Sequence, residues 1–355
     1  MKNIEKYRNL IAKGEVDALL LTSKHNRMYA AEYCVAEGVS VICKEESYYF
    51  TDFRYIEAAQ KNLPGFTVVM TDADHPYTKL INDAIAAHTV KTLGIEDDSL
   101  TVEEYTLYNT KLNAVLHPYS AEINAPRQSK EPWEIEYMKK AQEITDRTFE
   151  DLLNVIRPGM TEKELCAELI YRLYKFGSEG PSFDPITISG PNTSLPHGVP
   201  SERELQYGDF VTMDFGCLYH GYCSDMTRTI ALGYVSEKMD KVYHTVLEAQ
   251  LAGIAATKAG VTGKAMDAAA RKVIDDAGFV GCFGHSYGHS LGLLIHEAPN
   301  ASMRNDKPMP AGAVVSAEPG IYIPDEFGVR IEDVTVITDT GCEILTKSPK
   351  NLIIL

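Results

Sequence analysis

In the first part of the chain, two patterns of hydrophobic and polar positions alternate over short segments. Up to about residue 125, apolar runs of four to six residues alternate with segments whose apolar residues have helical spacing. The runs predict strands, and the segments between them predict helices. The predicted strands are 17–22, 39–43, 48–52, 66–70 and 92–96, and the predicted helices are 4–11, 53–62, 75–87 and 101–113. Such alternation is typical of an α/β domain.

The pattern changes after a stretch that carries proline and charged residues, near residues 120–130. A long helical pattern follows from Pro132 to Ile156. The chain of 355 residues is also longer than one hydrophobic core usually covers. We therefore expect two domains, residues 1–125 and 126–355.

The second region repeats itself weakly at a separation of about 100 residues. Each copy has a glycine turn with a threonine at a helix N-cap, then a His-x-x-Pro string, then a β-rich run that ends in a carboxylate. The matching pairs are 156–165 with 257–266, 195–200 with 294–299, 205–214 with 309–318, and 224–227 with 332–335. Four matches in the same order predict two similar halves, related by a pseudo-twofold axis, that share a central cleft.

Two aspartates stand in the densest part of the first copy. Asp214 ends one strand-like run, and Asp225 precedes the next, after a turn through Gly221. A hairpin would place both carboxylates on adjacent strands, where they repel each other unless a cation or a shared proton relieves them. Taken alone, each aspartate is more typical of a solvated turn.

The second copy supplies further groups of this kind. Residues 283–299 hold three histidines, and Glu318 and Glu332 interrupt strand-like apolar runs. A buried carboxylate costs several kcal/mol unless it is paired or bound to a metal. Arg228 and Arg330 offer salt bridges as an alternative, but two cations cannot neutralise four carboxylates.

The set of four carboxylates and one imidazole therefore favours two divalent metal ions. An oxygen-rich set suits manganese and magnesium, while the imidazole admits cobalt, iron or zinc. Two such ions, roughly 3.5–4 Å apart, lower the pKa of water and activate it for hydrolysis.

Composition narrows the class of protein. The formal net charge of −16 argues against a nucleic-acid partner, since phosphate binding needs a basic face. Seven scattered cysteines without a CxxC pair argue against a disulfide framework. No signal region opens the sequence, and no run approaches the ~18 apolar residues of a membrane span. We expect a cytoplasmic protein that binds neither nucleic acid nor membrane.

In these residues the chain resembles the pita-bread metallopeptidases, which include methionine aminopeptidase, aminopeptidase P, prolidase and the metal-free relative creatinase. The resemblance implies a creatinase-type α/β N-terminal domain and an α+β pita-bread catalytic domain with internal pseudo-twofold symmetry. All five metal-ligand positions of the family match, namely Asp214, Asp225, His289, Glu318 and Glu332. By resemblance, Asp225 and Glu332 bridge both metals. Asp214 then binds one metal, and His289 and Glu318 bind the other.

The resemblance also implies roles around the metals. Glu318 would take the proton of the attacking water. His197 would contact the substrate near the scissile carbonyl, and His296 would stabilise the tetrahedral intermediate. His285 and Arg330 match positions that line the substrate site.

One departure from the family lies next to a predicted ligand. Ser290 replaces a glycine in the string GHSLG. Serine would be strained there if the backbone needed a positive φ.

These observations predict a dinuclear-metal exopeptidase that cleaves the Xaa-Pro bond at the N-terminus of peptides. The alternative is an Xaa-Pro dipeptidase (prolidase), which would use an arginine to bind the carboxylate of proline. Here Asn300 follows the HEAP string, and the first basic residue is Arg304, which favours longer peptides. A methionine aminopeptidase would not need the N-terminal domain, and creatinase or a non-catalytic binding protein would not need all five ligands. The expected partners are small peptides with proline second, and a second copy in a homodimer.

Overall fold

The computed structural model describes residues 2–34 and 37–355, and the chain forms two compact units, Met1–Arg127 and Gln128–Leu355. Within the described part of the chain, each helix is too short or too polar to cross a membrane.

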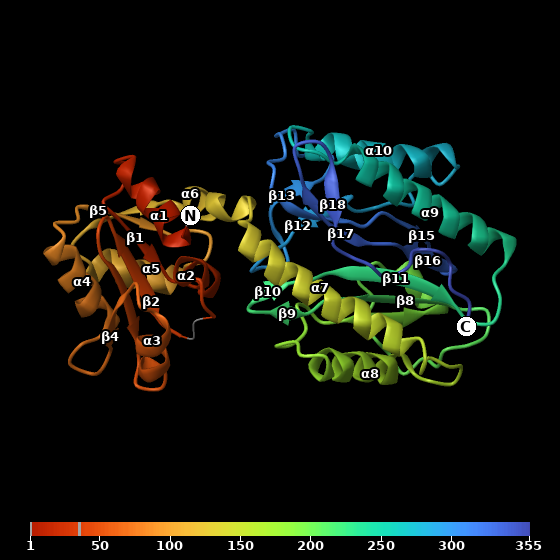
Figure 1. Ribbon diagram of the computed structural model, residues 1–355, viewed down its shortest axis with the longest axis horizontal. Coiled ribbons are helices and arrows are strands. Elements are labelled where there is room, and N and C mark those ends of the chain that lie inside the picture. The colour runs from red at the N-terminus through yellow and green to blue at the C-terminus, as the bar shows by residue number, and fades with distance from the viewer. Residues whose placement is uncertain (1, 35–36) are drawn as a thin grey trace. The chain divides into compact units, whose positions relative to one another are not determined.

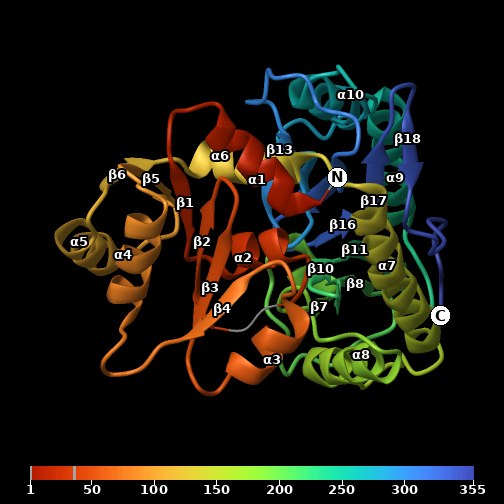
Figure 2. The same cartoon turned by 60° about the vertical axis from the view of Figure 1, so that its left-hand side comes forward.

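The N-terminal unit is an α/β domain. Its strands are β1 (Ala18–Leu21), β2 (Val39–Cys43), β3 (Ser47–Thr51), β4 (Thr67–Met70), β5 (Thr92–Ile95) and β6 (Val115–Pro118). They form one mixed sheet in the order β4-β3-β2-β1-β5-β6. The helices are α1 (Asn3–Ala12), α2 (Lys24–Ala31), α3 (Ile56–Asn62), α4 (Tyr77–Ala87), α5 (Val102–Lys111) and α6 (Ser120–Asn124). Figure 2 shows α4 and α5 on one side of the sheet, where Leu20, Ile81 and Leu93 share a hydrophobic core.

The apolar pattern found most of this domain's elements, although it gave no helix at α2 or α6. All five predicted strands and all four predicted helices are confirmed to within a few residues. The pattern missed β6, which lies at the edge of the sheet and has no buried residue. The other edge strand, β4, also has no buried residue but carries two adjacent valines and a methionine, whereas β6 has only two apolar residues before a histidine and a proline and so gives no strand-like run.

The short helix η1 (Ala125–Gln128) precedes the second unit, which has an α+β fold. Its helices are α7 (Pro132–Leu152), α8 (Glu162–Lys175), α9 (Glu237–Ala256) and α10 (Gly263–Asp276). Its strands are β7 (Ile186–Ser189), β8 (Phe210–Phe215), β9 (Leu218–Tyr219), β10 (Tyr222–Cys223), β11 (Met226–Ala231), β12 (Gly288–Ser290), β13 (Glu297–Ala301), β14 (Val314–Ala317), β15 (Gly320–Ile323), β16 (Phe327–Arg330), β17 (Asp333–Ile337) and β18 (Cys342–Ile344). In Figure 1 the strands of this unit lie between the pair α7–α8 and the pair α9–α10.

The two predicted halves of this unit are visible in the order of its strands. One sheet runs β11-β8-β7, and the other contains β17-β14-β12 in the corresponding order. The helices α8 and α10 also correspond, since each begins after a threonine, Thr161 or Thr262, whose side chain accepts a hydrogen bond from the backbone three residues on. The internal pseudo-twofold symmetry is therefore confirmed, and it places the ends of β8, β11, β14 and β17 around the centre of the unit.

Candidate metal centre

The first half positions its two aspartates on the paired strands β8 and β11. Asp214 lies in β8 opposite Thr227 of β11, and Asp225 directly precedes β11. The two sheets meet here, because the backbone N–H of Glu332 donates to the carbonyl of Thr227 over 3.1 Å. Glu332 directly precedes β17, so the symmetry brings it to the same place as Asp225.

The second half positions a histidine and a glutamate through one serine. His289 lies in the middle of β12, and its backbone N–H donates to Ser316 Oγ over 3.0 Å. The Ser316 hydroxyl donates in turn to Glu318 Oε1, also over 3.0 Å. The serine therefore fixes where the Glu318 carboxylate lies relative to β12.

These residues form one compact donor set. His289 Nε2 lies 3.3 Å from Glu318 Oε1 and 3.5 Å from Asp225 Oδ2. Asp225, His289 and Glu332 each offer a ligand atom, and these three atoms all lie within 4.8 Å of one another. Asp225 and Glu332 are only 3% and 1% exposed.

The electrostatics of this cluster are those of carboxylates buried together. Burial raises the pKa of Glu318 to about 7, and the Asp214 charge adds to the effect while Arg330 opposes it. The pKa values of Asp225 and Glu332 are likewise raised well above the ordinary range, first by burial and then by the neighbouring carboxylates. Burial lowers the pKa of His289, so its imidazole favours the neutral form that can bind a metal.

Several oxygens of the cluster also have no protein donor. Asp214 Oδ1, Asp225 Oδ1 and Glu332 Oε1 are buried and accept no hydrogen bond from any described residue. Buried acceptors are normally satisfied, and one left alone costs about 1–3 kcal/mol. Carboxylate oxygens and one imidazole are suitable ligands for divalent cations, so these residues fit such a centre.

Salt bridges to arginine, which were the alternative to metal ions, neutralise one of the four carboxylates. Arg330 Nη2 donates to Asp214 Oδ2 over 2.6 Å. Arg228 instead pairs with Asp333, the neighbour of Glu332, over 2.8 Å. Asp225, Glu318 and Glu332 have no ion pair with an arginine or lysine in residues 2–34 and 37–355.

The remaining predicted residues surround the donor set at different distances. The ring of His296 lies edge-on to that of His289, with centroids 4.4 Å apart. His285 does not belong to the donor set but is linked to it through two residues. Its Nε2 lies 2.8 Å from Tyr322 Oη, and this oxygen accepts a hydrogen bond from Arg330 Nη1. His197 is exposed on the turn after η2 (Gly190–Ser194), next to Pro196, whose carbonyl accepts a 3.1 Å hydrogen bond from Arg330.

Comparison with known proteins assigns the chain to a family. Residues 136–339 match the model of metallopeptidase family M24, and residues 3–129 match that of the creatinase/prolidase N-terminal domain. The chain belongs to metallopeptidase family M24. It therefore contains the catalytic domain of a family of metal-dependent peptidases, in line with the donor set.

Full-length relatives of this M24 chain carry peptidase names. It is 40% identical to the uncharacterized peptidase YqhT of Bacillus subtilis, over 99% of both chains. The structure of an Xaa-Pro dipeptidase from Bacillus anthracis has a TM-score of 0.96 at 43% identity, and covers 100% of this chain and 99% of that one. The structure of an X-Pro aminopeptidase from Thermotoga maritima has a TM-score of 0.92 at 34% identity, with 99% and 100% covered.

The serine beside the histidine of the M24 donor set is not strained. Ser290 belongs to β12 and pairs with Glu297 and Val315, and it is not among the described residues that have a positive φ. The strain anticipated for a serine at this position is therefore absent. The register of β12 with β13 shifts between Gly288 and Ser290, but the backbone at Ser290 still accepts a side chain.

Besides Ser316, sequence reasoning missed Thr227 and Tyr322, which also organise the M24 centre. Thr227 is fully buried, its hydroxyl donates to Glu332 Oε2 over 2.7 Å, and it accepts from Arg330 Nε over 3.0 Å. Tyr322 links Arg330 to His285. Thr227 could have been found, since it stands two residues after Asp225 and so shares its face of the strand. Nothing in the sequence around Tyr322 points to the site.

We expect Thr227→Val to weaken divalent-metal binding by about 10–100-fold, the usual effect of removing a group that orients a ligand. Valine keeps the shape but leaves Glu332 Oε2 without its donor. Thr227→Ser keeps the hydroxyl and is expected to bind as the wild type does. Calorimetric titration of the metal-free proteins with Mn²⁺ measures both, and equal affinity of the valine and serine variants would rule out the orienting role.

Proposed function

We propose that the protein is an Xaa-Pro aminopeptidase that uses two divalent ions, with manganese or cobalt the best fit. One observation carries the proposal, namely the set of four carboxylates and one histidine, in which three buried carboxylate oxygens accept no hydrogen bond from residues 2–34 and 37–355. The specificity for proline is supported by the names of similar proteins, an Xaa-Pro dipeptidase and an X-Pro aminopeptidase. The substrates would be small peptides with proline in the second position.

In this proposal five residues hold the metals, and two of them serve both ions. Asp225 and Glu332, whose ligand atoms lie close to His289, would be the bridging ligands. Asp214 would complete the coordination of one ion, and His289 and Glu318 would complete that of the other. Bound ions would supply an activated water and polarise the scissile carbonyl.

The protein's own groups then move the proton and stabilise charge. Ser316 orients the Glu318 carboxylate, which would accept the proton of the attacking water. His296, beside His289, would donate a hydrogen bond to the oxyanion that forms at the carbonyl. His197 would contact the substrate from the turn that Arg330 anchors, while His285 and Arg330 would line the site. The proline ring lacks an N–H, so the pocket needs no acceptor at that position.

The decisive experiment combines metal depletion with a peptide panel. We expect chelator-treated protein to be inactive and Mn²⁺ or Co²⁺ to restore cleavage of Ala-Pro-Ala. Zn²⁺ and Fe²⁺ serve as comparison metals. Ala-Ala-Ala tests the specificity, with an expected loss of at least about 100-fold in kcat/KM, the discrimination that differently shaped pockets reach. Full turnover without metal, or equal cleavage of both peptides, would disprove the proposal.

An Xaa-Pro dipeptidase is the second candidate, and the name of the similar Bacillus anthracis protein favours it. The two activities differ in whether the carboxylate of proline itself is required. A dipeptidase would cleave Ala-Pro and leave Ala-Pro-Ala intact. An aminopeptidase would cleave both.

We further propose residues 1–125 as the creatinase-type domain and 126–355 as the catalytic domain. We also propose a cytoplasmic location and a homodimer. The cysteines support a reducing compartment, since all seven are free thiols. Size-exclusion chromatography with light scattering measures the oligomeric state directly.

A further inference from the structure

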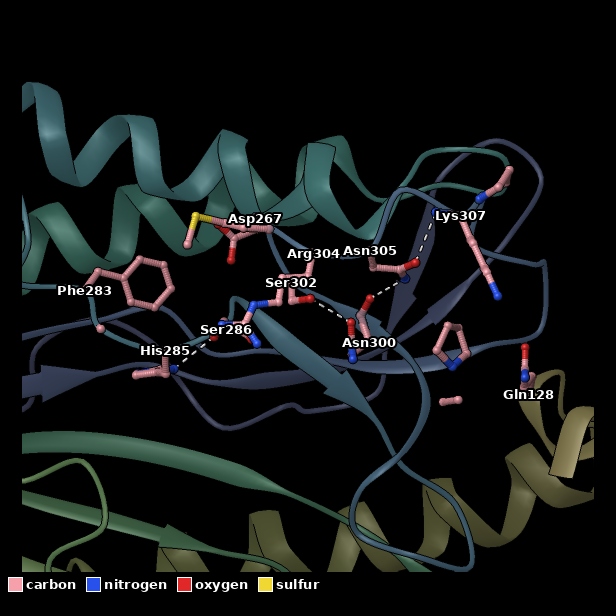
Figure 3. Close-up of a pocket in the computed structure, with 15 residues that line it drawn as sticks. Gln128, Asp267, Phe283, His285, Ser286, Asn300, Ser302, Arg304, Asn305 and Lys307 are labelled. Atoms are coloured by element: carbon pink, nitrogen blue, oxygen red, sulfur yellow. Dashed lines mark hydrogen bonds between the residues drawn. The ribbon is translucent and has the colours of Figure 1, made fainter. Parts of the chain in front are cut away.

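A cavity of about 720 Å³ in the second unit has His285, one of the predicted substrate-site residues, in its wall. This size falls within the range of roughly 300–1,000 Å³ that is usual for small-ligand sites. Figure 3 shows it between the loop at Phe283 and His285, helix α10 at Asp267, and the segment that carries Asn300 and Arg304. The predicted function of the metal ligands does not account for it.

The cavity carries an excess of positive charge. Arg304 and Lys307 line it, and neither side chain has an ion pair with any residue that the structure describes. The carboxylate in its wall, Asp267, is fully buried and already paired with Arg271 over 2.8 Å. Two uncompensated cations in a protein of net charge −16 favour an anionic ligand.

The polar groups of the wall also favour an acceptor. Asn300 Oδ1 accepts a 2.8 Å hydrogen bond from Ser302 Oγ, which leaves the amide NH₂ of Asn300 as a donor. The guanidinium of Arg304 has only donors. A carboxylate, which only accepts hydrogen bonds, matches such a wall.

The wall of the cavity contains one residue of the predicted substrate site and two residues that lie close to another such residue in the chain. His285 forms part of its wall and connects through Tyr322 to Arg330, which donates to Asp214. Ala298 and Pro299, which follow His296 in the chain, form another part. A peptide whose scissile bond lies at His296 therefore has this cavity as a neighbouring space.

A free peptide ends in a C-terminal carboxylate, and the cavity offers cationic side chains and hydrogen-bond donors. The cationic cavity therefore suits the C-terminal carboxylate. We infer that the cavity takes the residues that follow proline, and that Arg304 binds the C-terminal carboxylate of short Xaa-Pro-Yaa peptides. This inference rests on the proposed aminopeptidase function and specifies its substrates.

The test compares Ala-Pro-Ala with its C-terminal amide in the Mn²⁺-loaded wild type and in Arg304→Gln. The wild type is expected to have a KM about tenfold lower for the acid, since a charge-assisted hydrogen bond is worth about 1.4 kcal/mol or more. Arg304→Gln should lose this preference through KM, with kcat unchanged. Arg157→Gln, which removes an exposed arginine outside the cavity, should keep the preference.

The other possible results of this test contradict either the inference about Arg304 or the proposed function. If Arg304→Gln raises KM equally for the acid and the amide, or for neither, Arg304 does not bind the carboxylate and the inference is wrong. If it raises KM for the dipeptide Ala-Pro as strongly as for Ala-Pro-Ala, the carboxylate bound is that of proline, and the inference is also wrong. Cleavage of Ala-Pro-Ala by the wild type in these cases leaves the proposed function intact. Absence of cleavage of every Xaa-Pro peptide refutes the proposed function itself.

Discussion

Glu332→Gln is expected to raise the melting temperature of the metal-free protein by about 5 °C while abolishing its activity. The carboxylate of Glu332 is buried among Asp225, Glu318 and Asp214, which together with burial raise its pKa well above the ordinary range. A buried, uncompensated charge costs on the order of a few kcal/mol. In a domain of this size each kcal/mol shifts the melting temperature by roughly 2–4 °C. Glutamine keeps an acceptor for Thr227 but removes the charge.

The same substitution should abolish stabilisation by metal. In the wild type, Mn²⁺ binds the folded state only and raises the melting temperature by mass action. A glutamine at a bridging position serves neither ion well, so little shift should remain. Scanning calorimetry with and without Mn²⁺, at constant pH, measures both effects. A lower melting temperature of the metal-free variant would show that Glu332 is a structural residue.

Asp333 provides a matched control at the next position. It is equally buried, and burial alone would raise its pKa, but Arg228 and Lys350 outweigh burial and lower it. Asp333→Asn should therefore destabilise the protein, since breaking a buried ion pair costs about 3–5 kcal/mol. Two adjacent carboxylates are thus expected to give shifts of opposite sign.

The pH dependence of the metal-free protein follows from the same groups. The folded-state pKa of Glu318 is raised from 4.5 to about 7, and those of Asp225 and Glu332 are raised as well. Between about pH 4.5 and about pH 7 the folded state therefore binds more protons than the unfolded state. The free energy of unfolding then decreases as the pH rises through this range. Saturating Mn²⁺ should remove most of this dependence, because the cations take the place of the protons.

The sequence pointed to side chains that the structure brings together, but not to the hydrogen bonds that link them. Asp225 and Glu332 are 107 positions apart in the chain, and it was the repeat and the family resemblance, not a local pattern, that suggested that they meet. The hydrogen bond from the backbone of Glu332 to Thr227, which joins the two sheets, is a tertiary contact that no local pattern encodes. Ligand types follow from local strings, whereas the residues that orient them depend on how separate strands pack.

Arg330 illustrates the same limit. Its sequence neighbourhood allowed a salt bridge to a carboxylate or a role in binding substrate. In the structure, four of its five N–H groups donate to Thr227, Pro196, Tyr322 and Asp214. One N–H is left, so Arg330 cannot bind the carboxylate of a substrate in the bidentate way. This leaves Arg304 as the arginine for that task.

The second large effect is expected at His296. We predict that His296→Ala lowers kcat by about 10²–10³, the usual loss on removing a donor to an oxyanion, while metal content stays normal. The ring packs against His289, and His296 is itself an exposed residue at the end of the loop between β12 and β13. Burial and the neighbouring His289 lower the pKa of His296, so the imidazole is neutral near pH 7 and one ring nitrogen still carries a hydrogen to donate.

Metal analysis and kinetics together separate the two roles that His296 can have. A donor to the oxyanion lowers kcat and leaves two ions per chain, whereas a ligand lowers the metal content first and kcat with it. His244→Ala is the control, because it removes an exposed histidine on α9, outside the proposed site. His289→Ala provides the opposite comparison and should lose metal. If His296→Ala behaved as His289→Ala does, the donor set would comprise two histidines, and the oxyanion donor would have to be sought at His197.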